Sequence, residues 1–88
     1  MPISIKATKN TSTGIRGVQR YGAMFRWRVT AIRFRSLTGQ DPTPQFNALL
    51  NKRKSKCIDS GGFHSIEDAG DDLCRFLKEM TGVSFKYQ

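Results

Sequence analysis

Cysteine and histidine are scarce in this sequence, and long apolar runs are absent. Two cysteines and one histidine among 88 residues stand at no spacing typical of a zinc site. We therefore expect no bound metal and two reduced thiols, Cys57 and Cys74. No stretch approaches the roughly 20 apolar residues that span a membrane. Residues 1–6 contain no continuous apolar segment, which predicts no signal peptide and an intracellular protein.

Acidic residues are almost absent from the first two thirds of the chain. Residues 1–56 hold 12 Lys or Arg and a single acid, whereas residues 57–88 hold three basic residues and six acids. The net charge of +8 thus combines a basic part of +11 with an acidic part of −3. This asymmetry predicts a positive surface that binds a polyanion. We expect no membrane partner, because the basic part does not form an amphipathic helix.

The usual combinations of catalytic groups are also missing. The sequence contains no phosphate-binding loop, no nucleophile with an adjacent base and no paired carboxylates directed inward. The single histidine, His64, precedes a helical pattern and is interpreted as a helix-entry residue. We therefore expect a binding protein without a cofactor, and not an enzyme.

The stretch FRWRV, residues 25–29, alternates large apolar side chains with arginines. In a β-strand, such alternation places the apolar side chains on one face and both Arg26 and Arg28 on the other. Trp27 belongs to the apolar set, so we favour a core position for its ring over stacking on a base. The alternation fails after Thr30, where apolar residues fall on the arginine side.

The remaining pattern predicts two more strands and one helix. A first strand is expected over about 15–21, a turn at Gly22, and the second strand over 24–32 or as far as residue 35. Breaker residues over 36–54 predict a long loop, in which Thr43 and the following proline have the residue types that start a helical turn. A third strand is expected near residues 56–59.

The last element is an amphipathic helix over about 66–80. Ser65 has the residue type of an N-cap, acids fill the first turns, and Gly82 can end the helix. Its apolar residues recur at helical spacing. They are Ile66, Ala69, Leu73, Phe76, Leu77 and Met80.

These elements predict an α+β fold: a three-stranded antiparallel sheet packed on one C-terminal helix, with a long loop between strands 2 and 3. The helix covers one sheet face and leaves the arginine side free. We expect a domain over 14–82, a flexible basic arm over 1–13, and a tail over 83–88 that covers the core or adds a short strand.

Three segments resemble the AP2/ERF-type DNA-binding domain: GIRGV at 14–18, FRWRV at 25–29 and GFHSIEDA at 62–69. The arm-binding domains of tyrosine recombinases share that architecture. The resemblance covers residues 14–82 without the 36–54 loop. It implies a three-stranded sheet on one helix, with the sheet face in the major groove of DNA. It also implies that Arg16 contacts DNA, with Gln19 and Tyr21 at or near contact positions.

The sequence departs from the family at several contact positions. Arg28 stands where many plant members have a glutamate, and Thr30 where they have an arginine. Cys57 and Asp59 fall near the arginine and tryptophan of the family's third strand. The target sequence of the plant members is therefore not expected for this chain.

The arginine pattern and the resemblance together predict a double-stranded DNA-binding protein, a small transcription regulator or a nucleoid-type protein. Arginine reads guanine in the major groove and also binds phosphate. Such a protein would be cytoplasmic and nucleoid-associated in a prokaryote or phage, and nuclear in a eukaryote. The expected contact residues are Arg16, Gln19, Arg20, Tyr21, Arg26, Arg28, Thr30, Arg33, Arg35, Lys52, Arg53, Lys54 and Lys56.

Two other functions fit a basic surface. The first is RNA binding, which favours exposed stacking aromatics, and the second is binding of an acidic protein. A protein partner could also use the acidic helix face or the 36–54 loop. DNA binding alone predicts a preference for duplexes with a steep loss of affinity as salt rises.

Overall fold

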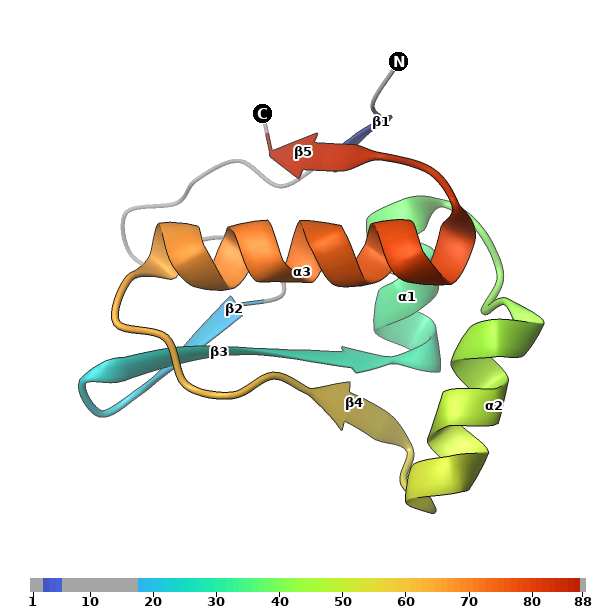
Figure 1. The fold of residues 1–88 in the computed structure, drawn as a ribbon, viewed down its shortest axis with the longest axis horizontal. Coiled ribbons are helices and arrows are strands. Elements are labelled where there is room, and N and C mark those ends of the chain that lie inside the picture. The colour runs from blue at the N-terminus through green and yellow to red at the C-terminus, as the bar shows by residue number, and fades with distance from the viewer. Residues whose placement is uncertain (1–2, 6–17, 88) are drawn as a thin grey trace.

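A β-hairpin forms the centre of the computed structural model, which describes residues 3–5 and 18–87 (Figure 1). The hairpin strands are β2 (Val18–Tyr21) and β3 (Met24–Thr30), paired antiparallel so that Tyr21 lies opposite Met24. Gly22 turns the chain with φ of 61°, a conformation that glycine adopts without steric cost. The predicted turn at Gly22 is confirmed.

The third strand, β4 (Cys57–Asp59), pairs antiparallel with the other edge of β3. The strand order is β2-β3-β4, so β3 is central and Ile58 lies opposite Val29. The predicted three-stranded antiparallel sheet is confirmed.

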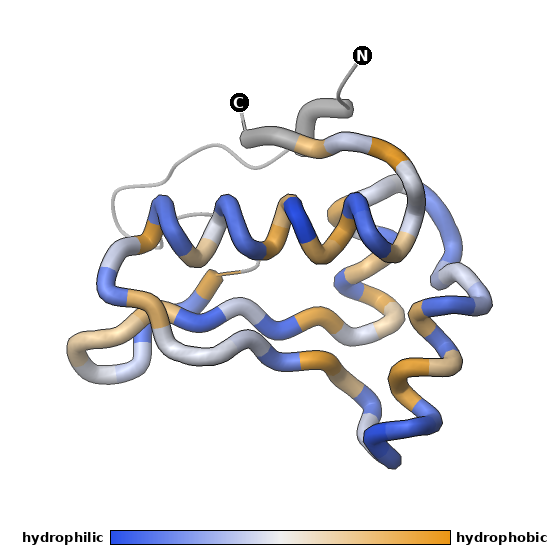
Figure 2. Tube along the Cα trace, in the orientation of Figure 1, coloured by the Kyte–Doolittle hydropathy of each residue, from blue (hydrophilic) through white to orange (hydrophobic). Residues whose placement is uncertain are grey.

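Helix α3 (Ile66–Thr81) packs on one face of this sheet (Figure 1). The Ser65 hydroxyl accepts a hydrogen bond from the Asp68 N–H at 3.0 Å, and Gly82 ends the helix with φ of 75°. Figure 2 shows the hydrophobic residues of α3 turned largely toward the sheet. Both predicted ends of this helix agree with the structure within one residue.

The core lies between α3 and the sheet, and it continues into two further helices. Its buried apolar residues are Val18, Trp27, Val29, Phe34, Leu37, Phe46, Ile58, Ala69, Leu73, Leu77, Met80 and Phe85. The buried residues of the sheet and of α3 are ones that the two-residue alternation of strands and the three- to four-residue spacing of the helix predict. Phe34, Leu37 and Phe46 come from the segment in which the sequence predicts a strand end and a loop.

The prediction that the second strand continues past Thr30 is wrong. Residues 31–38 form α1 (Ala31–Thr38) instead, and the Thr30 hydroxyl caps it by accepting the Arg33 N–H at 3.1 Å. Phe34 and Leu37 are buried on one side of this helix. That spacing matches a helical period, and a strand would have placed these two side chains on opposite faces.

The predicted long loop over 36–54 is also wrong. Helix α2 (Pro44–Arg53) fills most of it, with Thr43 as its N-cap as the residue types predict. The rings of Phe34 and Phe46 pack with their centroids 4.7 Å apart, and the Thr43 hydroxyl donates to the Met80 carbonyl at 3.0 Å. The segment is therefore part of the folded core.

The two ends of the chain form a separate pair of strands. β1 (Ile3–Ile5) and β5 (Phe85–Tyr87) run parallel, with Ile3 opposite Phe85. The tail therefore adds a short strand, which is one of its two expected roles. The expected flexible arm includes the strand β1, and its residues 6–13 lie outside the described part of the chain.

Candidate nucleic-acid interface

The sheet face opposite α3 carries the exposed arginines. Strand alternation and the strand register place five exposed side chains there. We call this surface the arginine face, and it consists of Gln19, Tyr21, Arg26, Arg28 and Asp59. All five are exposed, and none of the described helices covers them (Figure 1).

Arg26 is oriented by its neighbours on β2. Its guanidinium lies 5.5 Å from the centroid of the Tyr21 ring, within the range of a cation–π contact. The Tyr21 hydroxyl donates to Oε1 of Gln19 at 2.8 Å, and Gln19 lies directly opposite Arg26 in the register. Arg26 is exposed and makes no ion pair among the described residues, so its guanidinium is accessible from solvent.

Arg28 is paired instead. Its Nε–H donates to Oδ1 of Asp59 on β4 at 2.7 Å, and this hydrogen bond raises the pKa of Arg28 above its ordinary value. The two side chains remain 53% and 47% exposed. An ion pair so open to water is weak, so a stronger acceptor can replace Asp59.

The arginine face is not a small-molecule pocket. The hollow lined by Gln19, Tyr21, Arg26 and their neighbours on this face has a volume of about 40 Å³. Pockets for drug-sized ligands measure roughly 300–1,000 Å³. The face therefore suits an extended macromolecular partner.

A second group of cations continues this surface beyond β4. Figure 1 shows that the C-terminal end of α2 extends past the level of the sheet on the side away from α3. The run at this end is exposed and consists of Lys52, Arg53, Lys54 and Lys56. Its position supports the expectation that this run extends the basic side of the molecule.

Of the other expected contact residues, Arg20, Arg33 and Arg35 lie off the arginine face, and Thr30 is at the end of its β3 row. Arg20 falls on the opposite side of β2 from Gln19, and its Nε–H donates to the Gly22 carbonyl at the hairpin tip. Thr30 uses its hydroxyl to cap α1. Arg33 and Arg35 extend from α1 and not from a strand, and Arg35 pairs with Asp41. Arg16 lies outside the described residues.

The sequence alone does not reveal two parts of this surface. Asp59 meets Arg28 because of the β3–β4 register, which a three-residue strand does not fix by its pattern. Ile32 is exposed at the start of α1, which the sequence predicts as strand.

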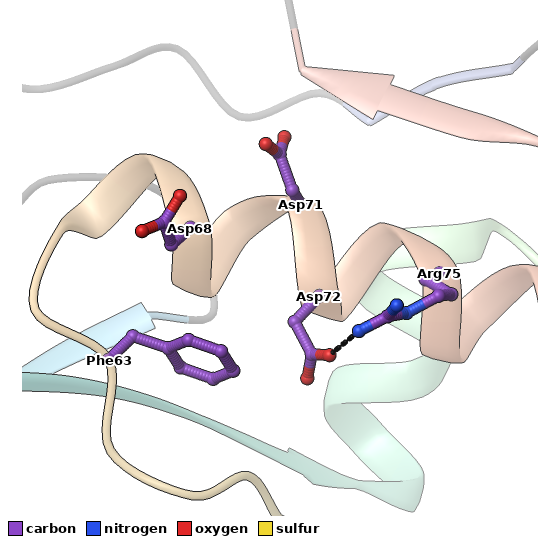
Figure 3. A pocket seen from close by; sticks show the side chains of 5 residues that line it. All are labelled: Phe63, Asp68, Asp71, Asp72 and Arg75. Atoms are coloured by element: carbon purple, nitrogen blue, oxygen red, sulfur yellow. Dashed lines mark hydrogen bonds and ion pairs between the residues drawn. The ribbon is translucent and has the colours of Figure 1, made fainter.

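The opposite side of the molecule is acidic. An open hollow of about 510 Å³ lies beside α3 and is lined by Phe63, Asp68, Asp71, Asp72 and Arg75 (Figure 3). Asp72 pairs with Arg75, while Asp68 and Asp71 make no ion pair among the described residues. Carboxylates on this side repel a polyanion, so the arginine face is the side for one to approach.

Comparisons with protein-family models, curated proteins and solved structures found no match to this chain. Within residues 3–5 and 18–87, no group of three His, Cys, Asp or Glu side chains could hold a metal ion. No helix in that part of the chain is long and apolar enough to cross a membrane.

Proposed function

We propose that this protein binds double-stranded DNA by placing the arginine face in the major groove. The observation that carries the proposal is the pair of arginines, Arg26 and Arg28, exposed on a sheet face that no described helix covers. The protein acts in this view as a small transcription regulator or nucleoid-type protein with an AP2/ERF-like mode of binding.

The dimensions of the sheet support groove binding. Neighbouring strands lie about 4.8 Å apart, so the backbones of β2, β3 and β4 span about 10 Å. The major groove of B-DNA is about 12 Å wide and admits narrow β-structures. The basic end of α2 then lies beside the groove, where lysines and arginines meet phosphates.

The side chains of the arginine face match the acceptors and donors of base edges. Arg26 can donate two hydrogen bonds to O6 and N7 of guanine, and Gln19 can pair with adenine. Arg28 can leave Asp59 for a guanine or a phosphate, because charge-assisted bonds to either acceptor are strong. Asp59 then remains as a hydrogen-bond acceptor for the amino group of cytosine.

Fluorescence anisotropy tests this function directly. The protein is titrated with AT-rich and GC-rich duplexes, single-stranded DNA and structured RNA from about 50 to 200 mM salt. We expect tight duplex binding that weakens steeply with salt and is lost in Arg26→Ala/Arg28→Ala. The matched control is Arg75→Ala/Lys78→Ala, which removes two exposed cations from α3 and should bind like the wild type.

The result also separates the alternatives. Equal or tighter binding to structured RNA would favour an RNA-binding protein. Nucleic-acid binding that does not depend on Arg26 and Arg28 would contradict groove binding by the arginine face. If the protein binds no nucleic acid at all, the result would favour an acidic protein as its partner.

A further inference from the structure

Exposed large apolar side chains are rare in this protein. Among the described residues there are two, Tyr21 at 44% exposure and Ile32 at 84%. Tyr21 is part of the arginine face and supports Arg26. Ile32 is the second residue of α1, directly beyond the end of β3. A single exposed apolar residue needs no explanation by itself, so its position carries the argument.

Ile32 lies two residues beyond the end of the β3 row that carries Arg26 and Arg28. Arg26, Arg28 and Thr30 occupy alternate positions of β3, and α1 begins where this row ends. Figure 1 shows α1 rising from the end of β3 toward α3, with its first turn at the level of the sheet. Phe34 points into the core, and a helix rotates about 100° per residue, so Ile32 points away from the core.

Ile32 adds little to the stability of the folded chain. At 84% exposure it removes almost no apolar area from water. Isoleucine is also a poorer helix former than alanine, because its branched side chain loses rotamer freedom. The Ile32 side chain is therefore free to contact a partner outside the folded monomer.

We propose that Ile32 contacts the C5 methyl group of a thymine at the end of the site occupied by the arginine face, an inference that rests on the proposed function. In the major groove, thymine alone presents an apolar methyl group, and phosphates and the other base edges offer polar atoms. The first turn of α1 contains no acidic residue, so DNA approaches this end of the helix without repulsion. Ile32 is thus a specificity-determining residue for A·T pairs.

Replacing thymine by deoxyuridine tests this contact, because it removes the methyl group and keeps every base-pairing atom. Anisotropy is measured with short mixed-sequence duplexes that contain either thymine or deoxyuridine. We expect the wild type to bind the deoxyuridine duplexes about three- to tenfold more weakly. Ile32→Ala should bind the thymine duplexes more weakly by a similar factor and lose nothing further with deoxyuridine. Its melting temperature should equal or slightly exceed that of the wild type, because the side chain is exposed and alanine is the better helix former.

Two results would overturn the inference. Ile32→Ala that shows the same thymine-to-deoxyuridine ratio as the wild type would exclude the methyl contact. A wild type that binds both kinds of duplex equally would exclude it as well. The Arg26→Ala/Arg28→Ala variant, measured alongside, separates the two proposals: if it loses duplex binding while the ratio does not depend on Ile32, only the thymine contact is wrong.

Discussion

The indole Nε1–H of Trp27 donates a hydrogen bond to Oδ2 of Asp72 at 2.8 Å, which joins the central strand to α3. The Trp27 ring is 4% exposed and packs against Phe76 with ring centroids 4.7 Å apart. The expected core position of Trp27 is therefore confirmed, and its ring is not available to stack on a base. Asp72 also pairs with Arg75, so its carboxylate links the side chains of Trp27 and Arg75.

Trp27→Phe should destabilise the protein by about 1–3 kcal/mol, because it removes the indole donor and leaves a part-buried carboxylate oxygen without that partner. Urea unfolding measures the change. A double-mutant cycle with Asp72→Asn isolates the hydrogen bond from the loss of ring volume. Purely additive effects in the cycle would contradict a contribution from this bond.

Asp59→Asn should strengthen duplex binding about three- to tenfold near 100 mM salt, because it frees Arg28 and removes a negative charge from the arginine face. A plot of the logarithm of the binding constant against the logarithm of the salt concentration should have a slope that is steeper by about one, which corresponds to one more released counterion. Glu79→Gln is the control, since it removes the same charge from an exposed position on α3. Weaker binding by Asp59→Asn would instead show that the carboxylate positions Arg28 for DNA.

Lys54→Gly should raise thermal stability and lower duplex affinity together. Lys54 ends α2 with φ of 50°, a left-handed conformation that costs a residue with a Cβ atom about 1–2 kcal/mol. A gain of about 1 kcal/mol raises the melting temperature by about 4–8 °C in a domain of this size. The lost charge weakens phosphate binding. The control Lys52→Gln should lower duplex affinity without changing the melting temperature. Equal melting temperatures for Lys54→Gly and the wild type would contradict backbone strain at Lys54.

Cys74 should make stability depend on pH in the alkaline range. Burial, helped by the negative charge of Asp71, raises the pKa of its thiol from 9.0 to about 11. Above pH 9.0 the unfolded chain loses this proton first, so the contribution of the protonated thiol is complete below pH 9.0 and is lost as pH approaches 11. The stability difference between the wild type and Cys74→Ala, measured by urea unfolding, should therefore shrink between about pH 8 and pH 10.5. A constant difference would contradict the raised pKa.

The hairpin, its turn and α3 could be predicted because their signals are local. Each signal depends on neighbouring residues only. The signals are the alternation around Trp27, the glycine at the turn, and the serine cap before residues at helical spacing. α1 could not be predicted in the same way. Ile32 and Phe34 alternate with Arg33 and Arg35 as in a strand, although with the opposite parity to residues 25–29. The helix is stabilised by the ring of Phe46, from α2, packing on Phe34.

In the candidate site, too, the features encoded by a local pattern could be predicted and those that depend on distant residues could not. Arg26 and Arg28 follow from strand alternation, which the structure keeps. The pairing of Arg28 with Asp59 depends on the register between two strands that 26 intervening residues separate, and no local pattern encodes that register. Arg33 and Arg35 do not lie on the sheet because residues 31–38 form a helix, whereas the sequence predicts a strand there.

Among the described residues, Arg26, Arg28 and the basic end of α2 lie on one side of the sheet and most carboxylates lie on α3 on the other side, which gives this part of the molecule an electric dipole (Figure 1). In the field of a polyanion, this dipole turns the protein so that the arginine face leads on approach, which speeds productive encounters. In the proposed binding mode, a bound copy would turn α3 and its carboxylates outward. A duplex covered by such copies would then present carboxylates on its outer surface, so two covered duplexes would repel each other. The protein would coat DNA without cross-linking it.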